Sequence, residues 1–267
     1  MFKTRLLSGI VLVLVALLTI CSGGTVLYMT VLCLSLIGAG ELFRAMKVRE
    51  DKWNLLEITG YAGVVIFYLS LLLHDPMYQM LALILDLVLL MAVYVFTYPK
   101  YNANQVMPAF FAVVYVGVML SYVYQTRMLD GGKFHVWLIF LCSWGCDTCA
   151  YCVGVLFGKH KMAPVLSPKK SIEGCIAGAV GAVVIAILYT VAMNLIYNLE
   201  YSYVLIGIIT VVLSIAGQLG DFAASSIKRY VNIKDYSNLI PGHGGMLDRI
   251  DSLMFLAPYA YVLLAMI

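Results

Sequence analysis

Three aspartates near the carboxyl terminus have the residue type and spacing of a metal site. Asp248 and Asp251 are three residues apart, which places both carboxylates on one face of a helix, and Asp221 ends the preceding apolar segment. Mg²⁺ takes oxygen ligands and usually completes its shell with water and substrate phosphate. The pattern indicates phosphoryl or nucleotidyl transfer, although taken alone Asp248 is better explained as a charge at a helix amino terminus, and Arg249 as a lipid contact.

The densest polar tract of the chain, from Gly220 to Ser252, surrounds these aspartates. Glycines flank His243 in a loop that can bring backbone N–H groups close to an anion just before a helix begins: Gly242, Gly244 and Gly245. The tract also carries hydroxyls and cations suited to phosphate: Ser225, Ser226, Lys228, Arg229 and Lys234. Taken one by one, the same residues have ordinary explanations. The glycines can form a plain turn, His243 can pack or cap a helix, and the Lys and Arg residues can contact anionic lipid.

Two further polar groups lie upstream. In the segment SPKKSIEG, Lys169, Lys170, Ser171 and Glu173 stand at the mouth of an apolar segment, where the Ser-x-Glu pattern is also typical of a simple helix start. In WGCDTCAY, Asp147 and Thr148 lie inside an apolar segment, where an acid costs about 2.5–3.5 kcal/mol and usually faces a polar cavity. Asp86 lacks such neighbours, and we expect it to form an interhelical hydrogen bond or a subunit contact.

The elements that must position these residues are membrane helices. The chain is 63% hydrophobic and 12% charged, against about 45–50% and about 25% in soluble domains. Its mean hydropathy is +0.96. Apolar segments near the spanning length of about 20 residues lie at 6–22, 25–43, 59–74, 78–98, 106–124, 134–157, 174–197, 202–220 and 250–267. They predict an all-α, polytopic bundle of about nine transmembrane helices and not a barrel, and the charge pattern offers no surface for nucleic acid.

The distribution of basic residues predicts the topology. With the amino terminus in the cytoplasm, only Arg127 and Lys133 of the 17 Lys and Arg residues fall outside. The three long polar loops, 44–58, 158–173 and 221–249, then face the cytoplasm. Residues 1–24 also resemble a signal peptide, but no small-residue cleavage site follows, so we expect an uncleaved first helix. We expect residues 1–125 to form a scaffold with possible dimer contacts, and residues 126–267 to carry the catalytic motifs.

The polar tracts together resemble the phosphatidate cytidylyltransferase family. Its signature is read here as Ser225-x-Ile227-Lys228-Arg229, Lys234-Asp235-x-Ser237, Pro241-x-His243-Gly244-Gly245 and Asp248-Arg249-x-Asp251. WGCDTCAY and SPKKSIEG resemble the same family and occur in the expected order, with Ser171 where relatives commonly carry threonine. The amino-terminal half matches only in being hydrophobic.

The resemblance implies an enzyme of phospholipid biosynthesis that joins CTP to phosphatidic acid, giving CDP-diacylglycerol and pyrophosphate. It implies Mg²⁺, with a second cation such as K⁺, bound by Asp221, Asp248 and Asp251, which act in catalysis with Lys228 and Arg229. It implies substrate contacts from Asp147, Thr148, Lys169, Lys170, Ser171, Glu173, Ser225, Ser226, Lys234, Asp235, His243, Gly244, Gly245 and Arg249. We expect a multi-pass protein of a bacterial-type inner membrane that is able to form a homodimer, with its active site facing the cytoplasm.

Two other classes remain open on the sequence. A CTP-dependent lipid kinase or a polyprenyl-lipid cytidylyltransferase would use similar acids and basic residues, and a kinase would release CDP in place of pyrophosphate. A transporter would use intramembrane acids such as Asp86 and Asp147 as a proton relay. The chain shows no paired Gly/Pro-broken segments of the kind that transporters use, which ranks this alternative low.

Overall fold

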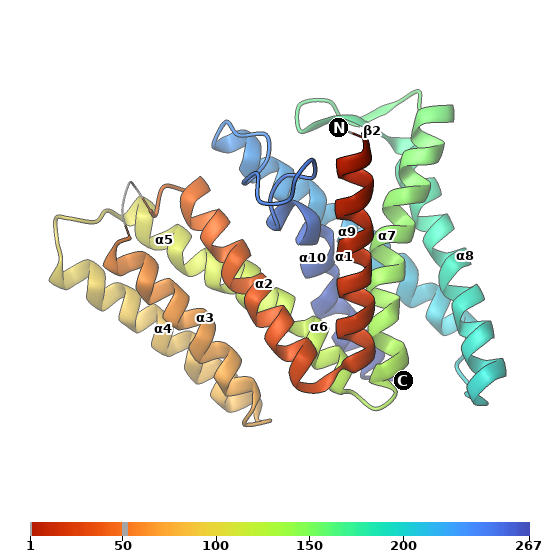
Figure 1. The fold of residues 1–267 in the computed structure, drawn as a ribbon, viewed down its shortest axis with the longest axis horizontal. Coiled ribbons are helices and arrows are strands. Elements are labelled where there is room, and N and C mark those ends of the chain that lie inside the picture. The colour runs from red at the N-terminus through yellow and green to blue at the C-terminus, as the bar shows by residue number, and fades with distance from the viewer. Residues whose placement is uncertain (1, 50–52) are drawn as a thin grey trace. The chain divides into compact units, whose positions relative to one another are not determined.

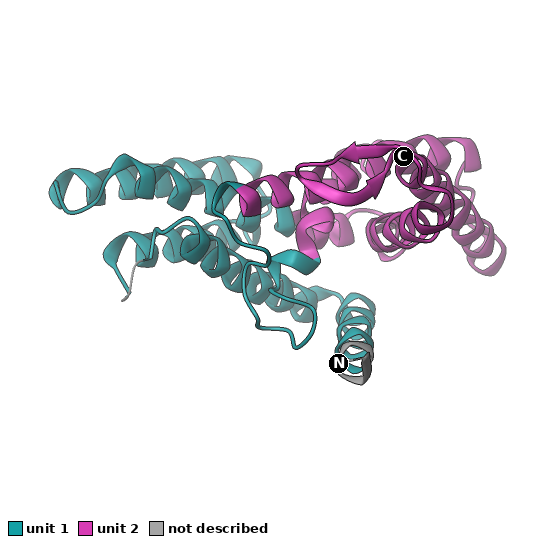
Figure 2. Ribbon diagram, turned by 90° about the horizontal axis from the view of Figure 1, so that it is seen from above, with its two compact units in different colours: residues 1–121, 230–249 teal, residues 122–229, 250–267 magenta. Residues whose placement is uncertain are grey.

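The computed structural model describes residues 2–49 and 53–267, with side chains from residue 7 onward. Lys52 and the side chains of Lys3 and Arg5, which support the predicted topology, lie outside the described part. The chain divides into two compact units, residues 1–121 with 230–249 (unit 1) and residues 122–229 with 250–267 (unit 2) (Figure 2). The chain first passes from unit 1 to unit 2 after Ser121, close to the expected domain boundary at residue 125. Residues 230–249, in contrast, belong to unit 1 with the amino-terminal helices.

Unit 1 is built from apolar helices. They are α1 (Phe2–Ser22), α2 (Gly24–Ala45), α3 (Leu55–Leu71), α4 (Pro76–Phe96), α5 (Ala103–Ala112), the π-helical stretch η1 (Val113–Val118) and the start of α6 (Met119–Met128) (Figure 1). Asn54 caps α3 by accepting a hydrogen bond from the Glu57 amide at 2.8 Å. In the core, the Tyr68 hydroxyl of α3 bonds the Ser35 hydroxyl of α2 at 2.7 Å. These contacts fix where α3 begins and how it packs on α2.

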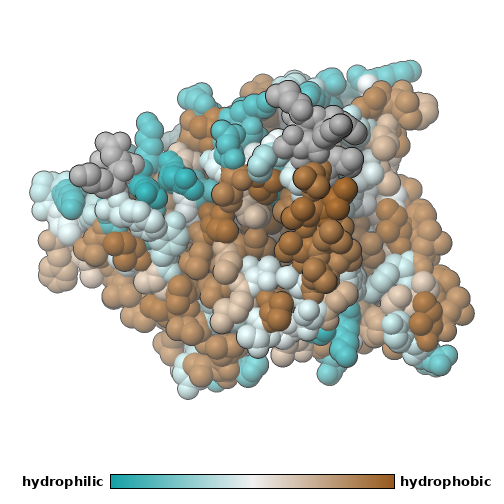
Figure 3. All heavy atoms as spheres, in the orientation of Figure 1, coloured by the Kyte–Doolittle hydropathy of each residue, from teal (hydrophilic) through white to brown (hydrophobic). Residues whose placement is uncertain are grey.

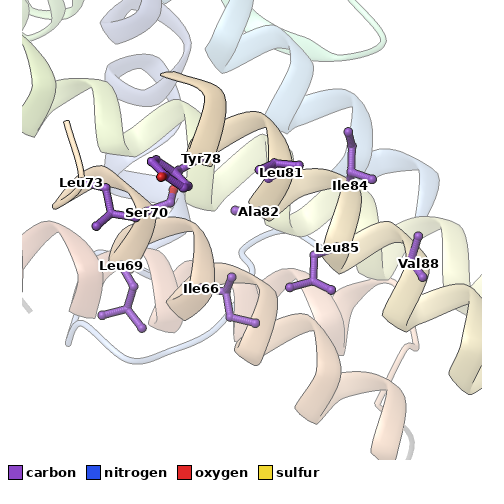
Figure 4. Close-up of a pocket in the computed structure, with 10 residues that line it drawn as sticks. All are labelled: Ile66, Leu69, Ser70, Leu73, Tyr78, Leu81, Ala82, Ile84, Leu85 and Val88. Atoms are coloured by element: carbon purple, nitrogen blue, oxygen red, sulfur yellow. The ribbon is translucent and has the colours of Figure 1, made fainter. Parts of the chain in front are cut away.

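The contact between α3 and α4 leaves an apolar groove of about 690 Å³. Its walls are aliphatic side chains such as Leu69, Leu73, Leu81 and Leu85 (Figure 4). Asp86 is buried on α4 where a Cβ on Gly63 of α3 would meet its carboxylate. Neither oxygen of that carboxylate has a hydrogen-bond partner among the described residues, so the predicted interhelical hydrogen bond of Asp86 is wrong within this chain. With aliphatic walls, the groove is unsuited to phosphate chemistry.

Unit 2 continues α6 and adds the remaining elements. They are α7 (Gly132–Phe157), β1 (Lys161–Ala163), β2 (Ser167–Ser171), α8 (Ile172–Tyr197), α9 (Tyr203–Tyr230) and α10 (Leu247–Leu264), with the first residues of α10 belonging to unit 1. The strands pair antiparallel, with Lys161 opposite Ser171. Ser171 caps α8 by accepting from the Gly174 amide at 3.2 Å. The Ser-x-Glu pattern is therefore a helix start.

The structure confirms a predominantly helical architecture with several helices suited to cross a membrane. In the described part of the chain, six helices are long and apolar enough to cross a membrane: α2, α4, α5 through α6, α7, α8 and α9. The apolar stretches Leu7–Ser22 and Leu55–Leu71 are shorter, and α10 begins with three charged residues. Nine spans therefore stay a prediction. Exposed hydrophobic side chains cover much of the helix surface, as contact with lipid requires (Figure 3).

All three predicted polar loops are partly regular structure, and two of them differ clearly from the prediction. Residues 221–230 continue α9 without a break, so the loop predicted from 221 begins only after Tyr230. Ala, Ser, Lys and Arg permit this extension, because helix propensity does not depend on an apolar environment. The loop predicted at 158–173 contains the β1–β2 hairpin. Hydropathy marks where a span leaves the lipid, and the helix can continue into water.

Candidate active site

In unit 2, Lys170 at the end of the hairpin meets Asp221 of α9. The Lys170 ammonium donates a short hydrogen bond to Asp221 Oδ2 and forms an ion pair with it. The same ammonium lies 4.7 Å from the centroid of the Phe222 ring, a cation–π contact. Both charged side chains are about one quarter exposed. The pair brings together two residues that the sequence predicts for the site from segments 51 positions apart.

The charge environment of Lys170 is acidic. Burial alone would lower the pKa of Lys170, but the charge of Asp221 and the hydrogen bond to it, with help from Asp147, raise that pKa above its usual value of 10.5. Asp251 lies within electrostatic range of Asp221, Lys228 and Asp147. Unit 2 therefore gathers acids from α7, α9 and α10 around two lysines, an arrangement that suits a polyanion whose charge is shared between cations and a metal.

Two residues of α9 that the sequence analysis did not single out position Asp221. The Gln218 amide donates to the Cys175 carbonyl of α8 at 3.0 Å and to Cys146 Sγ of α7 at 3.3 Å. A Cβ on Gly220 would lie 2.4 Å from the Phe255 Cβ and 2.8 Å from the Asp251 carbonyl oxygen of α10. Gln218 thus fixes α9 on one side and Gly220 lets α10 approach on the other. The sequence could have indicated these two residues only as a polar side chain and a glycine inside an apolar segment.

Other predicted residues of unit 2 have structural contacts. Ser225 donates to Asp221 Oδ1 at 3.4 Å, whereas the Ser226 hydroxyl bonds the Phe222 carbonyl of its own helix at 2.8 Å. Arg229 Nε donates to the Leu166 carbonyl of the hairpin at 3.4 Å. Glu173 accepts from the His160 amide at 3.2 Å and contacts His160 Nδ1 at 2.6 Å, so it fastens the hairpin to α8. The remaining predicted side chains of this unit are exposed: Thr148 and Lys169.

In unit 1, the Pro-Gly-His-Gly-Gly segment folds into a tight turn. The Ile240 amide donates to the Gly244 carbonyl and the His243 amide donates to the Ile240 carbonyl, both at 2.9 Å. Gly242 and Gly244 have φ values of 79° and 87°, which side chains rarely adopt. The turn requires glycine at these two positions. It places Gly244 directly beside Asp235 and Asp248, since a Cβ there would lie 3.2–3.3 Å from both side chains.

Asp248 holds the loop together at the start of α10. Its Oδ2 accepts hydrogen bonds from the Tyr236 amide at 2.8 Å and the Gly245 amide at 3.0 Å. The residue is buried, with 7% of its surface exposed. Lys234, Asp235 and Arg249 are exposed around it. Asp248 thus joins the middle of the loop that precedes α10 to its last residues.

The amino-terminal helices contact this loop through residues that the sequence analysis missed. Glu41 of α2 accepts from the Met246 amide at 2.9 Å and the Leu247 amide at 2.7 Å. Ser8 of α1 lies 2.8 Å from His243 Nδ1 and donates to the Pro241 carbonyl at 3.2 Å. These partners lie some two hundred positions away in the chain, so no local spacing could have indicated them.

The three aspartates predicted as metal ligands are divided by the boundary between the units, which falls after Arg249. Among residues 2–49 and 53–267, no group of three or more His, Cys, Asp or Glu side chains is arranged to hold a metal ion. The donor chemistry nevertheless fits Mg²⁺, because all three candidates are carboxylates and Asp221 and Asp251 of unit 2 interact electrostatically. The metal site remains a prediction.

The helices are apolar enough to span a membrane, and their polar ends carry acids, lysines and a glycine turn. These features define the class of membrane enzymes that act on phosphate-containing substrates. The chain belongs to the cytidylyltransferase family, whose model matches residues 3–267. It is 34% identical over 267 residues to the phosphatidate cytidylyltransferase of Staphylococcus epidermidis, with 98% of each chain covered. It is 35% identical over 270 residues to that of Staphylococcus aureus, again with 98% of each chain covered. The resemblance seen in the motifs is therefore confirmed.

Proposed function

We propose that this chain is a phosphatidate cytidylyltransferase, which converts CTP and phosphatidic acid to CDP-diacylglycerol and pyrophosphate. The observation that carries the proposal is similarity over nearly the whole length to relatives with this name, at 34–35% identity. The paired acids and lysines of unit 2 and the glycine turn of unit 1 supply the groups that such chemistry needs.

The reaction joins two phosphates. A non-bridging oxygen of the lipid phosphate forms a bond to the α-phosphorus of CTP, and the bond from that phosphorus to the oxygen bridging to the β-phosphorus breaks. Pyrophosphate leaves with the bonding electrons. A phosphate monoester has a second pKa of about 6, so the attacking oxygen is largely deprotonated near neutral pH and needs no strong base. Orientation and charge compensation are then the main catalytic tasks.

Cationic side chains supply part of that compensation. We assign Lys228 and Arg229 of α9 to the transferring phosphate and Lys170 to the substrate phosphates, with Asp221 holding Lys170 in place. The remaining substrate contacts of the proposal come from α7, the hairpin, the starts of α8 and α10, the end of α9 and the polar loop: Asp147, Thr148, Lys169, Ser171, Glu173, Ser225, Ser226, Lys234, Asp235, His243, Gly244, Gly245 and Arg249. For Ser171, Ser226 and Glu173, the contacts described above support an indirect role, in which they shape the hairpin and the helix ends.

The proposal includes a divalent cation held by Asp221, Asp248 and Asp251. Mg²⁺ bound there would neutralise the charge of the triphosphate and of the leaving pyrophosphate, with a second cation such as K⁺ beside it. Asp248 and Asp251 lie on one continuous helix, and Asp221 shares unit 2 with Asp251. These arrangements, together with the sequence motif, support the assignment.

We further propose that nine spans place the amino terminus and the polar loops at the cytoplasmic face of the cell membrane. CTP would then enter from the cytoplasm and phosphatidic acid from the inner leaflet. The charge segregation of the sequence supports this arrangement. A homodimer formed through residues 1–125 belongs to the same proposal.

The test is an assay of the purified protein in detergent with phosphatidic acid, CTP and Mg²⁺, which follows both pyrophosphate and the lipid product. We expect metal-dependent release of pyrophosphate together with CDP-diacylglycerol. Asp248→Asn should lower turnover by about 10²-fold or more, the scale of removing a group that stabilises charge in the transition state. Thermal unfolding of the variant in detergent checks that it is folded.

Asp75→Asn is the matched control. Asp75 caps α4 by accepting from the Met77 amide at 2.9 Å, and asparagine caps equally well, so turnover should stay at the wild-type value. Release of CDP with a phosphorylated lipid would indicate a lipid kinase instead. A protein that is folded and consumes no CTP with phosphatidic acid contradicts the proposal.

A further inference from the structure

Glu41 makes an unusual set of contacts for an acid in an apolar helix. It lies in α2, four residues before Ala45, the last residue of the helix, and it is fully buried. Oε1 accepts from the Ser237 hydroxyl at 2.5 Å and from the Met246 amide at 2.9 Å, and Oε2 accepts from the Leu247 amide at 2.7 Å. A buried carboxylate is stable only when donors surround it, and here two donors come from the loop before α10 and the third from Leu247, the first residue of that helix.

The two amides belong to the amino terminus of α10, which begins at Leu247. The first N–H groups of a helix have no partner within it, and a negative charge is favoured there. Glu41 supplies that charge from another helix, 205 and 206 positions away in the chain. Glu41 therefore caps α10 through a tertiary contact, where most helices are capped by a residue adjacent in sequence.

Any side chain at position 245 would displace the Glu41 carboxylate. A Cβ on Gly245 would lie 2.8 Å from each carboxylate oxygen of Glu41. The Gly245 amide meanwhile donates to Asp248 Oδ2 at 3.0 Å. Gly245 thus lies between two carboxylates, and both bond the backbone where the loop joins α10. A shift of Glu41 would move the backbone that aims Asp248.

We propose that Glu41 is a positioning residue for nucleotidyl transfer, which fixes the start of α10 and thereby the direction of the Asp248 carboxylate. The inference rests on the proposed function for its catalytic consequence. It assigns a role in the active site to α2, a helix that the sequence marks only as hydrophobic scaffold.

Glu41→Gln is the decisive variant because it keeps the size of the side chain. An amide has one acceptor oxygen, so its NH₂ group must face at least one of the loop donors. We expect the Mg²⁺ concentration for half-maximal turnover to rise about tenfold or more, with the KM for phosphatidic acid unchanged. In metal-free protein, hydrogen exchange at the Met246 and Leu247 amides should accelerate relative to wild type. A loss of general stability would not shift the Mg²⁺ requirement selectively.

Glu57→Gln is the matched control. Glu57 is equally buried in unit 1, and its ion-pair partner is Arg49 at 3.5 Å, outside the loop. The control should leave the Mg²⁺ requirement and the exchange at Met246 unchanged. Ser237→Ala removes one of the three donors and should shift both readouts in the same direction by less. Its effect should be non-additive with that of Glu41→Gln.

The outcomes separate this inference from the proposed function. Wild-type protein without cytidylyl transfer would overturn the function, and hydrogen exchange would still test the cap. Active wild type with an unchanged Mg²⁺ requirement in Glu41→Gln would overturn the positioning role. Should Glu41→Gln fail to fold, Ser237→Ala decides, because a wild-type Mg²⁺ requirement in that variant also overturns the role.

Discussion

Lys170 and Asp221 show how one contact can organise a cluster of charges. Asp251 of α10 interacts electrostatically with both Asp221 and Asp147, and without a cation it would be repelled by them. Lys170 reaches in from the hairpin and compensates part of that charge. The cation–π contact with Phe222 fixes the ammonium further. A substrate phosphate approaching this cluster would meet a lysine that is already oriented, which is the kind of preorganisation that phosphoryl chemistry favours.

Replacing this lysine tests its contribution. Lys170→Gln removes the charge and keeps most of the side-chain length, so Asp221 loses its ion-pair partner. We expect turnover to fall by about 10²-fold, the scale of one lost group of electrostatic stabilisation. The measurement is pyrophosphate release at saturating CTP and phosphatidic acid. Lys161→Gln, an exposed change in the same hairpin, should keep wild-type turnover.

The pH dependence of this effect follows from the raised pKa of Lys170. The folded protein favours the charged amine, so the contribution of the ion pair is fully present below the usual pKa of 10.5 and is lost as pH rises through the higher folded value. The ratio of wild-type to Lys170→Gln turnover should stay constant from about pH 7 to about pH 9. A ratio that falls across this range would show that Lys170 loses its proton near neutrality, against the assignment.

At the scale of elements, α7 and α8 pack through small residues. A Cβ on Gly174 would lie 2.7 Å from the Ala150 carbonyl oxygen, and one on Gly178 would lie 2.8 Å from the Cys146 carbonyl oxygen. The glycines are four residues apart on α8, the spacing that lets two membrane helices approach closely. Because Gln218 bonds both helices of this pair, the packing of α7 and α8 also sets the position of α9 and of Asp221.

Adding one methyl group at this contact should separate the helices. In Gly178→Ala the new Cβ meets backbone, which cannot move aside like a flexible side chain. We expect a loss of about 1–3 kcal/mol in stability, the usual cost of overpacking, seen as a lower midpoint of thermal unfolding in detergent. Gly207→Ala in α9 is the control, since its Cβ would have 3.9 Å contacts and alanine favours a helix. Equal midpoints for both variants would contradict the close packing.

The sequence predicted the apolar helices well because a membrane helix must be apolar over its full length, and composition records this directly. It placed the end of α9 too early, since residues 221–230 are polar and yet helical. It recognised the motif residues but not Glu41, Ser8 or Gln218, whose roles come from contacts across 43 to 235 positions of chain. Such contacts arise from the fold and leave no trace in spacing. The glycine turn could be predicted in part, because the positive φ angles of Gly242 and Gly244 favour glycine and so leave a mark in the sequence.

For the whole molecule, the distribution of charge argues for one orientation in the membrane. Lys and Arg cluster in alternate connections along the chain, and only Arg127 and Lys133 depart from that alternation under a nine-span topology. The proposed active-site residues lie in the same basic connections or beside them. An orientation that placed them outside would separate the site from CTP, which is a cytoplasmic nucleotide in the proposed reaction.

Reporter fusions test the number of spans and the orientation together. With nine spans and a cytoplasmic amino terminus, the carboxyl terminus after Ile267 lies outside the cell membrane. Alkaline phosphatase fused there should be active and green fluorescent protein dark, while both patterns should reverse for fusions in the loop after Tyr230. If α10 did not cross the membrane, a carboxyl-terminal fusion would behave like the loop fusion, and three charged residues at its start are the reason that outcome must be measured. Opposite signals at the two positions require an odd number of crossings between them, which α10 alone can provide.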